Sequence, residues 1–550
     1  MAWDRSIRAS TNEGKLTVHI DDSATRAWPA WLRCALLLAV LLSGCMSLPD
    51  VADRHWEAAL PAAQQGPLAR LAANSCETGD CGLRLIGSAS EALQARLALI
   101  EGATQSVDLQ VYQFKGDASG REVMRALRDA AARGVRVRVL VDDLYTTGDE
   151  LLWRALAAQP GVELRLFNPF LAGRESHVGR LFEAAFGSER MHHRMHNKLL
   201  VADGVLALAG GRNIADAYFL PSAQGHFVDI DVLIAGASLP QMSLGFDLYW
   251  NSAYSHSLQS VLNAGLADAP APSAWTGALD RPCISDACAA VAQVLREPTP
   301  LAAELASGRL SMHHGLTLVA FDSPEKVEND DVADDLGMLA RTGAQVRLLV
   351  AQAIQGAQRE VLVVSPYLIP GPTGIAGVAT MRRRDVQITM LTNSLASTDE
   401  PFVHLSYSKY RAALLREGVT LYEWAPAGGR RVVRELVAGA PVLRLHVKAV
   451  IVDRETVFLG SMNFDPRSRD VNTEFGMLVR SRELAEELHA LLQQMIDEGA
   501  YRLHLQPDGR SLRWTRGDGS VAAEGGEPDT DPASRLLLQL LGPLVPEELL

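Results

Sequence analysis

A three-residue pattern occurs twice in this chain and limits its possible folds more than any other part of the sequence. A histidine, a lysine two positions later and an aspartate five positions after that recur: His196, Lys198 and Asp203, then His446, Lys448 and Asp453. With 14 His and six Lys in 550 residues, one chance copy is expected roughly once per hundred such chains. Two copies therefore indicate an internal duplication.

The segments around the two copies repeat in the same order. The apolar, β-rich runs before the first copy have equivalents before the second: 106–114, 133–143 and 161–170, then 360–370, 384–394 and 418–427. Their separations are 254, 251 and 257 residues, against 250 for the motif. Because these runs alternate with helix-like segments, we predict an α/β fold. It would consist of two duplicated α/β/α domains related by a pseudo-two-fold axis, each with a mostly parallel sheet.

Composition suggests where the domains begin and end. An Ala- and Pro-rich stretch from residue 266 to 283 has the character of a linker. The predicted order is a tether at 45–82, an N-terminal domain at 83–265, a linker or insertion at 266–340, a C-terminal domain at 341–500 and an extension at 501–550.

Each motif places its histidine and its lysine on one side of the chain. Side chains two residues apart in a strand share a face, so His196 lies beside Lys198, and His446 lies beside Lys448. We expect each pair to act together in one site.

A short turn follows each copy of the motif, GGRN after the first and GSMN after the second. The glycines permit a sharp turn with close approach of the backbone. The amides of Asn213 and Asn463, which end these turns, can bind an anion. The turns differ at one position, where the first copy has Gly211 and the second has Ser461.

Two carboxylates also occupy equivalent positions, Asp229 after the first turn and Glu474 after the second. A carboxylate that accepts the N–H of one ring nitrogen fixes the tautomer of a histidine and raises its basicity. We therefore expect Asp229 and Glu474 to orient the motif histidines. Asp203 and Asp453 are expected to support the motif structurally.

The paired motif resembles the phospholipase D superfamily from about residue 83 onward. The similarity to its bacterial cardiolipin synthase C branch rests on four stretches: RMHNKLLVADGVLALAGGRNIADAYF at 194–219, TNSLASTDEPFVHLSYSKYRAALLREGV at 392–419, GSMNFDPRSRDVNTE at 460–474 and the segment from EPDTD to PEELL at 527–550. The resemblance implies that the two motifs meet across the domain interface and form one active site. It also implies a phosphohistidine intermediate, with His196 as nucleophile and His446 as acid and base. Nothing else in the sequence distinguishes the two roles.

The motif side chains suit phosphodiester chemistry. Negative charge that develops on the phosphoryl oxygens can be bound by Lys198, Lys448, Asn213 and Asn463. One histidine can attack phosphorus while the other protonates the leaving alcohol and later activates the acceptor. We expect no metal and no other cofactor, because the lysines supply the positive charge.

The resemblance implies a phosphatidyltransferase of the cardiolipin synthase kind. Its substrates would be phosphatidylglycerol or phosphatidylethanolamine as donor and the glycerol hydroxyl of a second phosphatidylglycerol as acceptor. The nearest alternative is a hydrolase that releases phosphatidic acid. A nuclease or other phosphodiesterase, or an inactive lipid-binding lipoprotein, ranks lower. The formal net charge of −13 argues against nucleic acid as a partner. The motifs encode neither the donor lipid nor any accessory protein.

The N-terminus predicts export and lipid anchoring. The apolar run CALLLAVLL at 34–42 is too short to span a bilayer but fits the apolar region of a signal peptide. The following LSGC resembles a lipobox. We therefore expect residues 1–44 to be a signal peptide and Cys45 to be lipidated at a membrane surface facing the periplasm. An ordinary signal peptide or a short buried segment is the alternative. Met46 after the cysteine favours the outer over the inner membrane.

Four further cysteines form two pairs with equal spacing, Cys76 with Cys81 and Cys283 with Cys288. In an oxidising compartment each pair can form a local disulfide. A zinc site is the alternative. It is disfavoured because neither pair has the tight spacing of zinc ligands or a nearby histidine.

Overall fold

The structure, a computed structural model, describes residues 54–75, 81–170, 193–220, 225–264, 272–326, 345–426, 442–541, 545 and 547. These residues all fall within one unit, Leu48–Leu550. The predicted signal peptide and the lipidation site at Cys45 lie outside the described residues.

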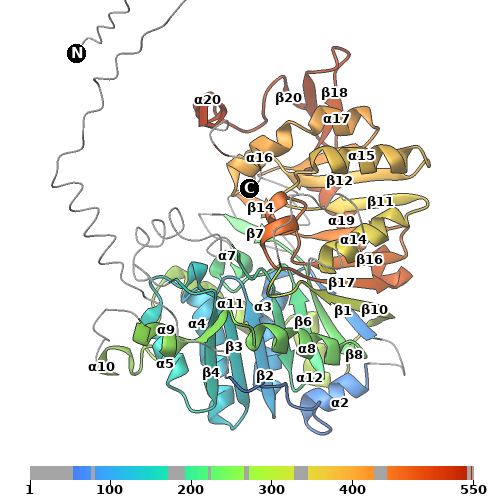
Figure 1. The fold of residues 1–550 in the computed structure, drawn as a ribbon. Coiled ribbons are helices and arrows are strands. Elements are labelled where there is room, and N and C mark those ends of the chain that lie inside the picture. Colours follow the sequence, from blue (N-terminus) through green and yellow to red (C-terminus); the bar gives the residue numbers. More distant parts are fainter. Residues whose placement is uncertain are drawn as a thin grey trace, which may run out of the picture. The chain divides into compact units, whose positions relative to one another are not determined.

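The first repeat forms a sheet with helices on both faces (Figure 1). Its strands are β1 (Cys81–Ile86), β2 (Ser106–Val111), β3 (Arg136–Asp142), β4 (Val162–Phe167), β5 (Leu199–Ala202), β6 (Leu206–Gly210), β8 (Asp231–Gly236) and β9 (Ser255–Ser257). They pair in the order β1-β8-β6-β5-β2-β3-β4-β9. The helices around this sheet are α2 (Pro67–Ala73), α3 (Ala89–Gly102), α4 (Ala118–Ala132), α5 (Glu150–Ala157), α7 (Asp216–Phe219), α8 (Leu239–Trp250) and α9 (Leu258–Ala264).

The second repeat forms an equivalent sheet with extra strands at one edge. Its strands are β10 (His313–Phe321), β11 (Glu360–Val364), β12 (Gln387–Asn393), β13 (Thr420–Trp424), β15 (Ala449–Val452), β16 (Thr456–Gly460), β17 (Phe475–Arg480), β18 (Ala500–Leu505), β19 (Leu512–Thr515) and β20 (Val521–Glu524). They pair in the order β10-β17-β16-β15-β11-β12-β13-β18-β19-β20. The helices are α14 (Gln345–Gln355), α15 (Gly371–Arg382), α16 (Pro401–Ser408), α17 (Arg411–Arg416), α19 (Arg482–Gly499) and α20 (Pro532–Leu541).

The six strand-like runs predicted from the sequence are all strands: β2, β3 and β4 in the first repeat, and β11, β12 and β13 in the second. The expectation of a mostly parallel sheet is wrong, because in the two described sheets only these strands pair in parallel. The strands that follow each motif form the hairpins β5–β6 and β15–β16. Their connections are too short for a crossover and permit only antiparallel pairing.

Strand β10 joins the two sheets. It pairs antiparallel with β17 of its own repeat and with β1 of the first repeat, where Gly82 lies opposite His314. The segment 266–340, predicted as a linker or insertion, therefore contributes a strand to the sheet. A hydrophobic core shared by both repeats contains α8 and α19, with Phe246 and Leu488 among its buried side chains.

Two smaller pairings also cross between the repeats, close to the motifs. Strand β7 (His226–Val228) pairs in parallel with β14 (Leu443–Leu445). Met195 forms an isolated parallel bridge with Thr473. Each motif is thus held directly by backbone of the opposite repeat.

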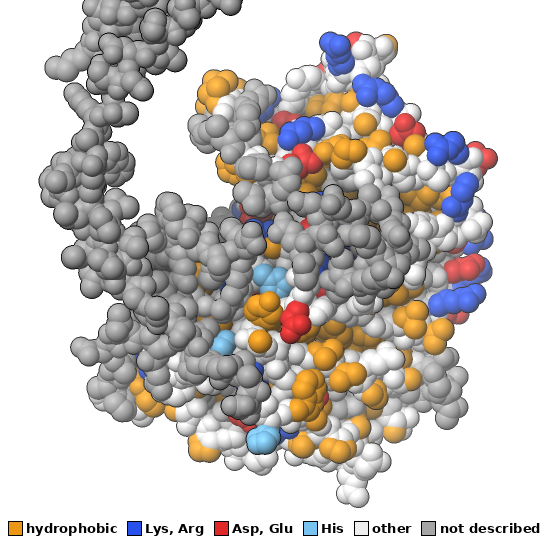
Figure 2. Space-filling model, viewed as in Figure 1, with side chains coloured by type: hydrophobic (Ala, Val, Ile, Leu, Met, Phe, Trp, Pro, Cys, Tyr) orange, Lys and Arg blue, Asp and Glu red, His pale blue; other side chains and the backbone are white. Residues whose placement is uncertain are grey.

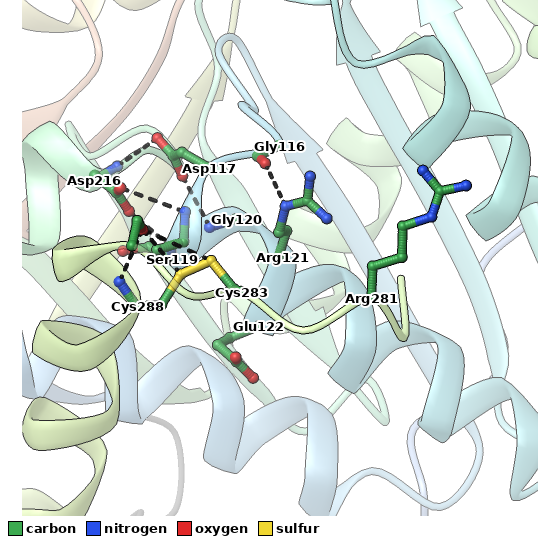
Figure 3. The surroundings of a disulfide bond; sticks show 12 residues. Gly116, Asp117, Ser119, Gly120, Arg121, Glu122, Asp216, Arg281, Cys283 and Cys288 are labelled. Carbon is green, nitrogen blue, oxygen red and sulfur yellow. Dashed lines mark hydrogen bonds between the residues drawn. A yellow bond between two sulfur atoms is a disulfide. The ribbon is translucent and has the colours of Figure 1, made fainter. Parts of the chain in front are cut away.

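The described linker also contains three helices, α10 (Pro272–Trp275), α11 (Asp286–Arg296) and α12 (Pro300–Ser307). A disulfide joins Cys283 and Cys288, the local pairing expected from their spacing. Figure 3 shows it near Asp216 and the first turn of α4.

Cys81 is a free, buried thiol. Its sulfur accepts the N–H of Ser238 at 3.2 Å, because the first residue of β1 turns its side chain into the core. The predicted disulfide between Cys76 and Cys81 is therefore wrong, because Cys81 is a free thiol. Cys76 itself lies outside the described residues.

The C-terminal extension adds β19, β20 and α20 to the second repeat. Figure 2 shows hydrophobic side chains over α20, where Leu536 and Leu540 are 59% and 65% exposed. These residues are four apart, so they lie on one face of the helix. None of the helices that the structure describes is both long and apolar enough to cross a membrane.

Candidate active site

Each motif precedes a central strand and is aligned by the opposite repeat. The N–H of His196, just before β5, donates to the carbonyl of Thr473 at 2.9 Å. The N–H of His446, just before β15, donates to the carbonyl of Val228 at 2.8 Å. Thr473 and Val228 each precede one of the expected carboxylates, so these bonds bring histidine and carboxylate together.

The carboxylates are exchanged between the repeats. His196 Nδ1 lies 3.0 Å from Glu474 Oε2, and His446 Nδ1 lies 2.6 Å from Asp229 Oδ2. The carboxylate assigns the tautomer, because only a protonated Nδ1 can donate to it. In the neutral ring, Nε2 then carries a lone pair that can attack phosphorus or accept a proton.

Burial dominates the electrostatics of the two pairs. Burial lowers the pKa of His196 to about 4, against the opposing effect of Glu474. Burial, followed by the charges of Lys448 and Lys198, lowers the pKa of His446 well below its ordinary value. Burial alone would raise the pKa of Glu474, but His196 and Lys198 outweigh it and hold it at about 2. Both lowered pKa values favour neutral imidazoles at pH 7, and a bound phosphodiester anion would favour their protonation.

Each lysine is folded back onto its own motif. Lys198 Nζ donates to the carbonyl of His196, and Lys448 Nζ donates to the carbonyl of His446, both at 2.6 Å. Burial lowers the pKa of Lys448 to about 8 and that of Lys198 well below its ordinary value. An ammonium has three donors, so each lysine keeps N–H groups for phosphoryl oxygens. In the part of the chain that the structure describes, no group of three or more His, Cys, Asp and Glu is placed to hold a metal.

The motif aspartates anchor backbone. The Asp203 carboxylate accepts three successive N–H groups at the start of β2, and Asp453 does the same at the start of β11. The donors are Thr104, Gln105 and Ser106, then Gln358, Arg359 and Glu360. Asp203 and Asp453 have φ of 53° and 54°, in the left-handed region that Asp and Asn tolerate better than most residues. Both features tie the hairpin turn after the motif to a neighbouring strand.

The two asparagines, predicted to be equivalent phosphate ligands, differ in their surroundings. Asn213 Oδ1 accepts the N–H of Gln113 at 3.1 Å, and its Nδ2 donates to the hydroxyl of Tyr218 at 2.8 Å. Asn463 Oδ1 is buried and has no hydrogen-bond partner among the described residues. Asn213 is therefore the more constrained of the two, while Asn463 has capacity for a ligand.

The difference between Gly211 and Ser461 follows from the two carboxylates. A Cβ at Gly211 would lie 2.4 Å from both carboxylate oxygens of Asp229, so only glycine fits there. In the other repeat, the Ser461 hydroxyl donates to Glu474 Oε2, the oxygen that also binds His196. The two carboxylates are thus held by different means.

Sequence reasoning missed the aromatic residues around the histidines. The ring of Tyr112 lies edge-to-face with His196, with 4.9 Å between ring centres. Tyr218 and Phe227 lie 5.3 and 5.2 Å from the ring of His446. For Tyr218, the available signal was the DAYF stretch after the first turn, which the second copy lacks.

Asp465 is a second omission, and the first repeat has Ala215 at the equivalent position. Its Oδ1 accepts the N–H of Ser468 at 2.7 Å. Burial raises its pKa to about 7, and repulsion from Glu474 acts in the same direction. Asp465 therefore adds a titratable group to the second half of the site.

A buried cluster behind the site holds the segment before His446. Arg411 donates to His404, Glu423 and Glu527, and the distances are 2.7, 2.7 and 2.6 Å. The other ring nitrogen of His404 donates to the carbonyl of Asn393 at 3.2 Å. The amide of Asn393 binds both the N–H and the carbonyl of Leu445, the residue before His446, at 2.9 Å. The C-terminal extension thus reaches the site through Glu527.

Residues 97–237 and 350–496 match the family described as cardiolipin synthase, PLD-like domain. Cardiolipin synthase C of Escherichia coli (strain K12) is 34% identical over 442 residues, which are 79% of this chain and 89% of that protein. An uncharacterized protein of Helicobacter pylori (strain ATCC 700392 / 26695) is 27% identical over 469 residues, 82% of this chain and 86% of that protein.

A solved structure shares the fold. Phosphatidylserine synthase from Haemophilus influenzae Rd KW20 superposes with a TM-score of 0.53 and 14% identity, over 85% of this chain and 95% of that chain. At this level of identity, the likeness concerns the fold alone. It includes both repeats, since 85% of this chain is covered.

Proposed function

The chain belongs to the cardiolipin synthase, PLD-like domain family, and from this membership we propose that it is a phosphatidyltransferase that forms cardiolipin. The observation that carries the proposal is the exchanged pair of His–carboxylate contacts, His196 with Glu474 and His446 with Asp229. They provide two imidazoles with available Nε2 atoms in one site, which is what a two-step transfer requires.

In the first step, His196 Nε2 attacks the phosphorus of the donor phospholipid. An N–P bond forms and the bond from phosphorus to the headgroup oxygen breaks, while protonated His446 gives its Nε2 proton to that oxygen. Lys198 and Lys448 bind the charge that develops on the phosphoryl oxygens. The product of this step is a phosphatidyl group on His196 and a free headgroup alcohol.

In the second step, His446 acts as a base. Its Nε2 takes the proton of the acceptor hydroxyl, the acceptor oxygen bonds to phosphorus, and the N–P bond to His196 breaks. His446 is then protonated again and His196 is free. The proposed acceptor is the glycerol hydroxyl of phosphatidylglycerol, and the proposed donor is phosphatidylglycerol or phosphatidylethanolamine.

Mass spectrometry of products from mixed micelles of these two lipids tests the proposal. We expect cardiolipin from the wild-type protein and none from His446→Ala. His313→Ala is the matched control, because His313 pairs with Glu487 at the surface and its loss should change neither product nor rate. Headgroup-labelled donors identify the lipid consumed. Phosphatidic acid as the sole product would instead make the protein a hydrolase.

Lipid substrates require access to a membrane surface, and we propose that lipidated Cys45 supplies it on the periplasmic side of the cell envelope, with the outer membrane favoured. Cell fractionation of Cys45→Ser tests this placement. We expect the variant to leave the membrane fraction. Retention in that fraction would contradict the anchor without bearing on the chemistry.

A further inference from the structure

The hydroxyl of Tyr218 lies 3.4 Å from Nε2 of His446, the nitrogen that exchanges protons in the proposed reaction. Asn213 Nδ2 donates to the same hydroxyl at 2.8 Å. Tyr218 is only 3% exposed, so its hydroxyl is fixed between these two groups. An incoming alcohol or water therefore has to compete with it for His446 Nε2.

The directions of these hydrogen bonds follow from their neighbours. Asp229 takes the Nδ1 proton of His446, so Nε2 is an acceptor in the neutral ring. Asn213 Nδ2 can only donate, so the Tyr218 oxygen accepts from it and the Tyr218 proton faces His446. Burial raises the pKa of Tyr218 well above its ordinary value, which keeps that proton in place.

Aromatic packing holds Tyr218 rigidly. Phe227 stacks on its ring with 4.7 Å between centres, and both rings lie edge-on to His446. Tyr218 has no aromatic counterpart in the second repeat. The equivalent residue there is Ser468, whose hydroxyl accepts the backbone N–H of Asn463 at 3.2 Å.

The other histidine lacks this arrangement. Tyr112 packs edge-on against His196, but His196 has a single hydrogen-bonded ring nitrogen among the described residues, Nδ1 with Glu474. Among the described residues, a hydroxyl therefore lies at the reacting nitrogen of His446, the proposed acid and base, but not at that of His196, the proposed nucleophile. The asymmetry therefore affects the second step, in which His446 takes a proton from the acceptor.

We propose that Tyr218 is a positioning residue that favours alcohol over water as the acceptor. The role rests on the function proposed above. A water held between Asn213 Nδ2 and His446 Nε2 would be deprotonated and would attack the phosphohistidine. The Tyr218 hydroxyl fills this place with a group that cannot reach phosphorus, because its ring is fixed. A glycerol hydroxyl brought close by a lipid competes for His446 Nε2 only with a contact of 3.4 Å, which is long for a hydrogen bond.

Tyr218→Phe tests the proposal, because it keeps the aromatic packing and removes the hydroxyl. The freed space has two polar partners for a water, which is what an ordered water needs. We expect the ratio of phosphatidic acid to cardiolipin to rise by about fivefold or more, roughly the effect of one net hydrogen bond. Raising the phosphatidylglycerol concentration should bring the ratio down again, since alcohol and water compete for one intermediate.

The ratio of products does not depend on how much of the variant is folded, so partial misfolding cannot imitate the result. Tyr422→Phe, at a half-buried tyrosine of β13, is the matched control and should leave the ratio unchanged. An unchanged ratio in Tyr218→Phe would overturn the role of Tyr218 and leave the transferase standing. Wild-type protein that forms no cardiolipin would refute the proposed function itself, and with it this role.

Discussion

His196 Nδ1 lies 3.0 Å from Oε2 of Glu474, a carboxylate 278 residues away in the other repeat. The reciprocal contact joins His446 to Asp229 at 2.6 Å across 217 residues. Neither repeat therefore contains a complete histidine–carboxylate pair. Duplication in a single chain keeps both halves together, and the site exists only where the repeats pack.

The exchange predicts which substitution affects which histidine. With a nitrophenyl phosphodiester, whose leaving group needs no proton, we expect Glu474→Gln to slow the release of nitrophenol by about 10²–10⁴-fold, because His196 loses its orienting charge. Asp229→Asn should keep this first burst and slow the later turnover. Rapid-quench kinetics separates the two steps. The opposite pattern would assign the nucleophile to His446.

The glycine beside Asp229 should tolerate less change than the serine beside Glu474. Gly211→Ala places a methyl group 2.4 Å from both oxygens of Asp229, so the carboxylate must leave His446, and we expect kcat/KM to fall by at least about tenfold. Ser461→Ala removes one hydrogen bond to Glu474 and should cost about fivefold. Steady-state kinetics of the two variants checks the order, and equal losses would contradict it.

We expect kcat/KM to fall at alkaline pH. Lys448 has a pKa lowered to about 8 by burial, so it carries its charge below pH 8 and loses it above. Because that charge binds the phosphoryl group, kcat/KM should decline as the pH rises through about 8. The Lys448→Arg variant keeps a positive charge over this whole pH range. Whatever the absolute kcat/KM of the variant, the decline near pH 8 should disappear. A decline near pH 8 that persists in Lys448→Arg would assign it to another group.

The motif aspartates should matter for stability more than for chemistry. Asp203→Ala leaves three buried or half-buried N–H groups and the Thr104 hydroxyl without their acceptor. We expect a loss of roughly 2–4 kcal/mol in the free energy of unfolding. Asp453→Ala should cost less, since its partners lie nearer to solvent. Urea denaturation measures both, and folded Asp203→Ala should retain most of its turnover.

Glu527 should stabilise the second repeat from the C-terminal extension. It shares the buried Arg411 with Glu423, so Glu527→Gln should lower the free energy of unfolding by about 1–3 kcal/mol. Glu547→Gln is the matched control in the same extension. Its ion-pair partner Lys409 is 60% exposed, and surface pairs contribute roughly 0–1 kcal/mol. Its other partner, the Tyr410 hydroxyl, can donate to the amide oxygen of glutamine as well. Equal effects would show that the buried cluster is not a source of stability.

Much of the fold can be predicted from the sequence, because local patterns of residues indicate its strands and turns. The six strand-like runs, the two turns and the paired carboxylates all lie at short, repeated spacings, and the structure has the strands where the runs predicted them. The expectation of a mostly parallel sheet fails at the hairpins, because apolar runs carry no information about which neighbour a strand takes. The same limitation explains Cys81, whose burial against Ser238 depends on a helix 157 residues away.

The duplication, the residues that each copy brings to a site and the difference between Gly211 and Ser461 can all be read from the order of the amino acids. Which histidine each carboxylate serves, and that Tyr218 lies at His446 and not at His196, follow from the packing of the two repeats. These contacts are set by the pairing of β7 with β14 and by the bridge of Met195 with Thr473. Such pairings form between segments more than 200 residues apart, and the local sequence of a segment does not indicate which distant segment it pairs with.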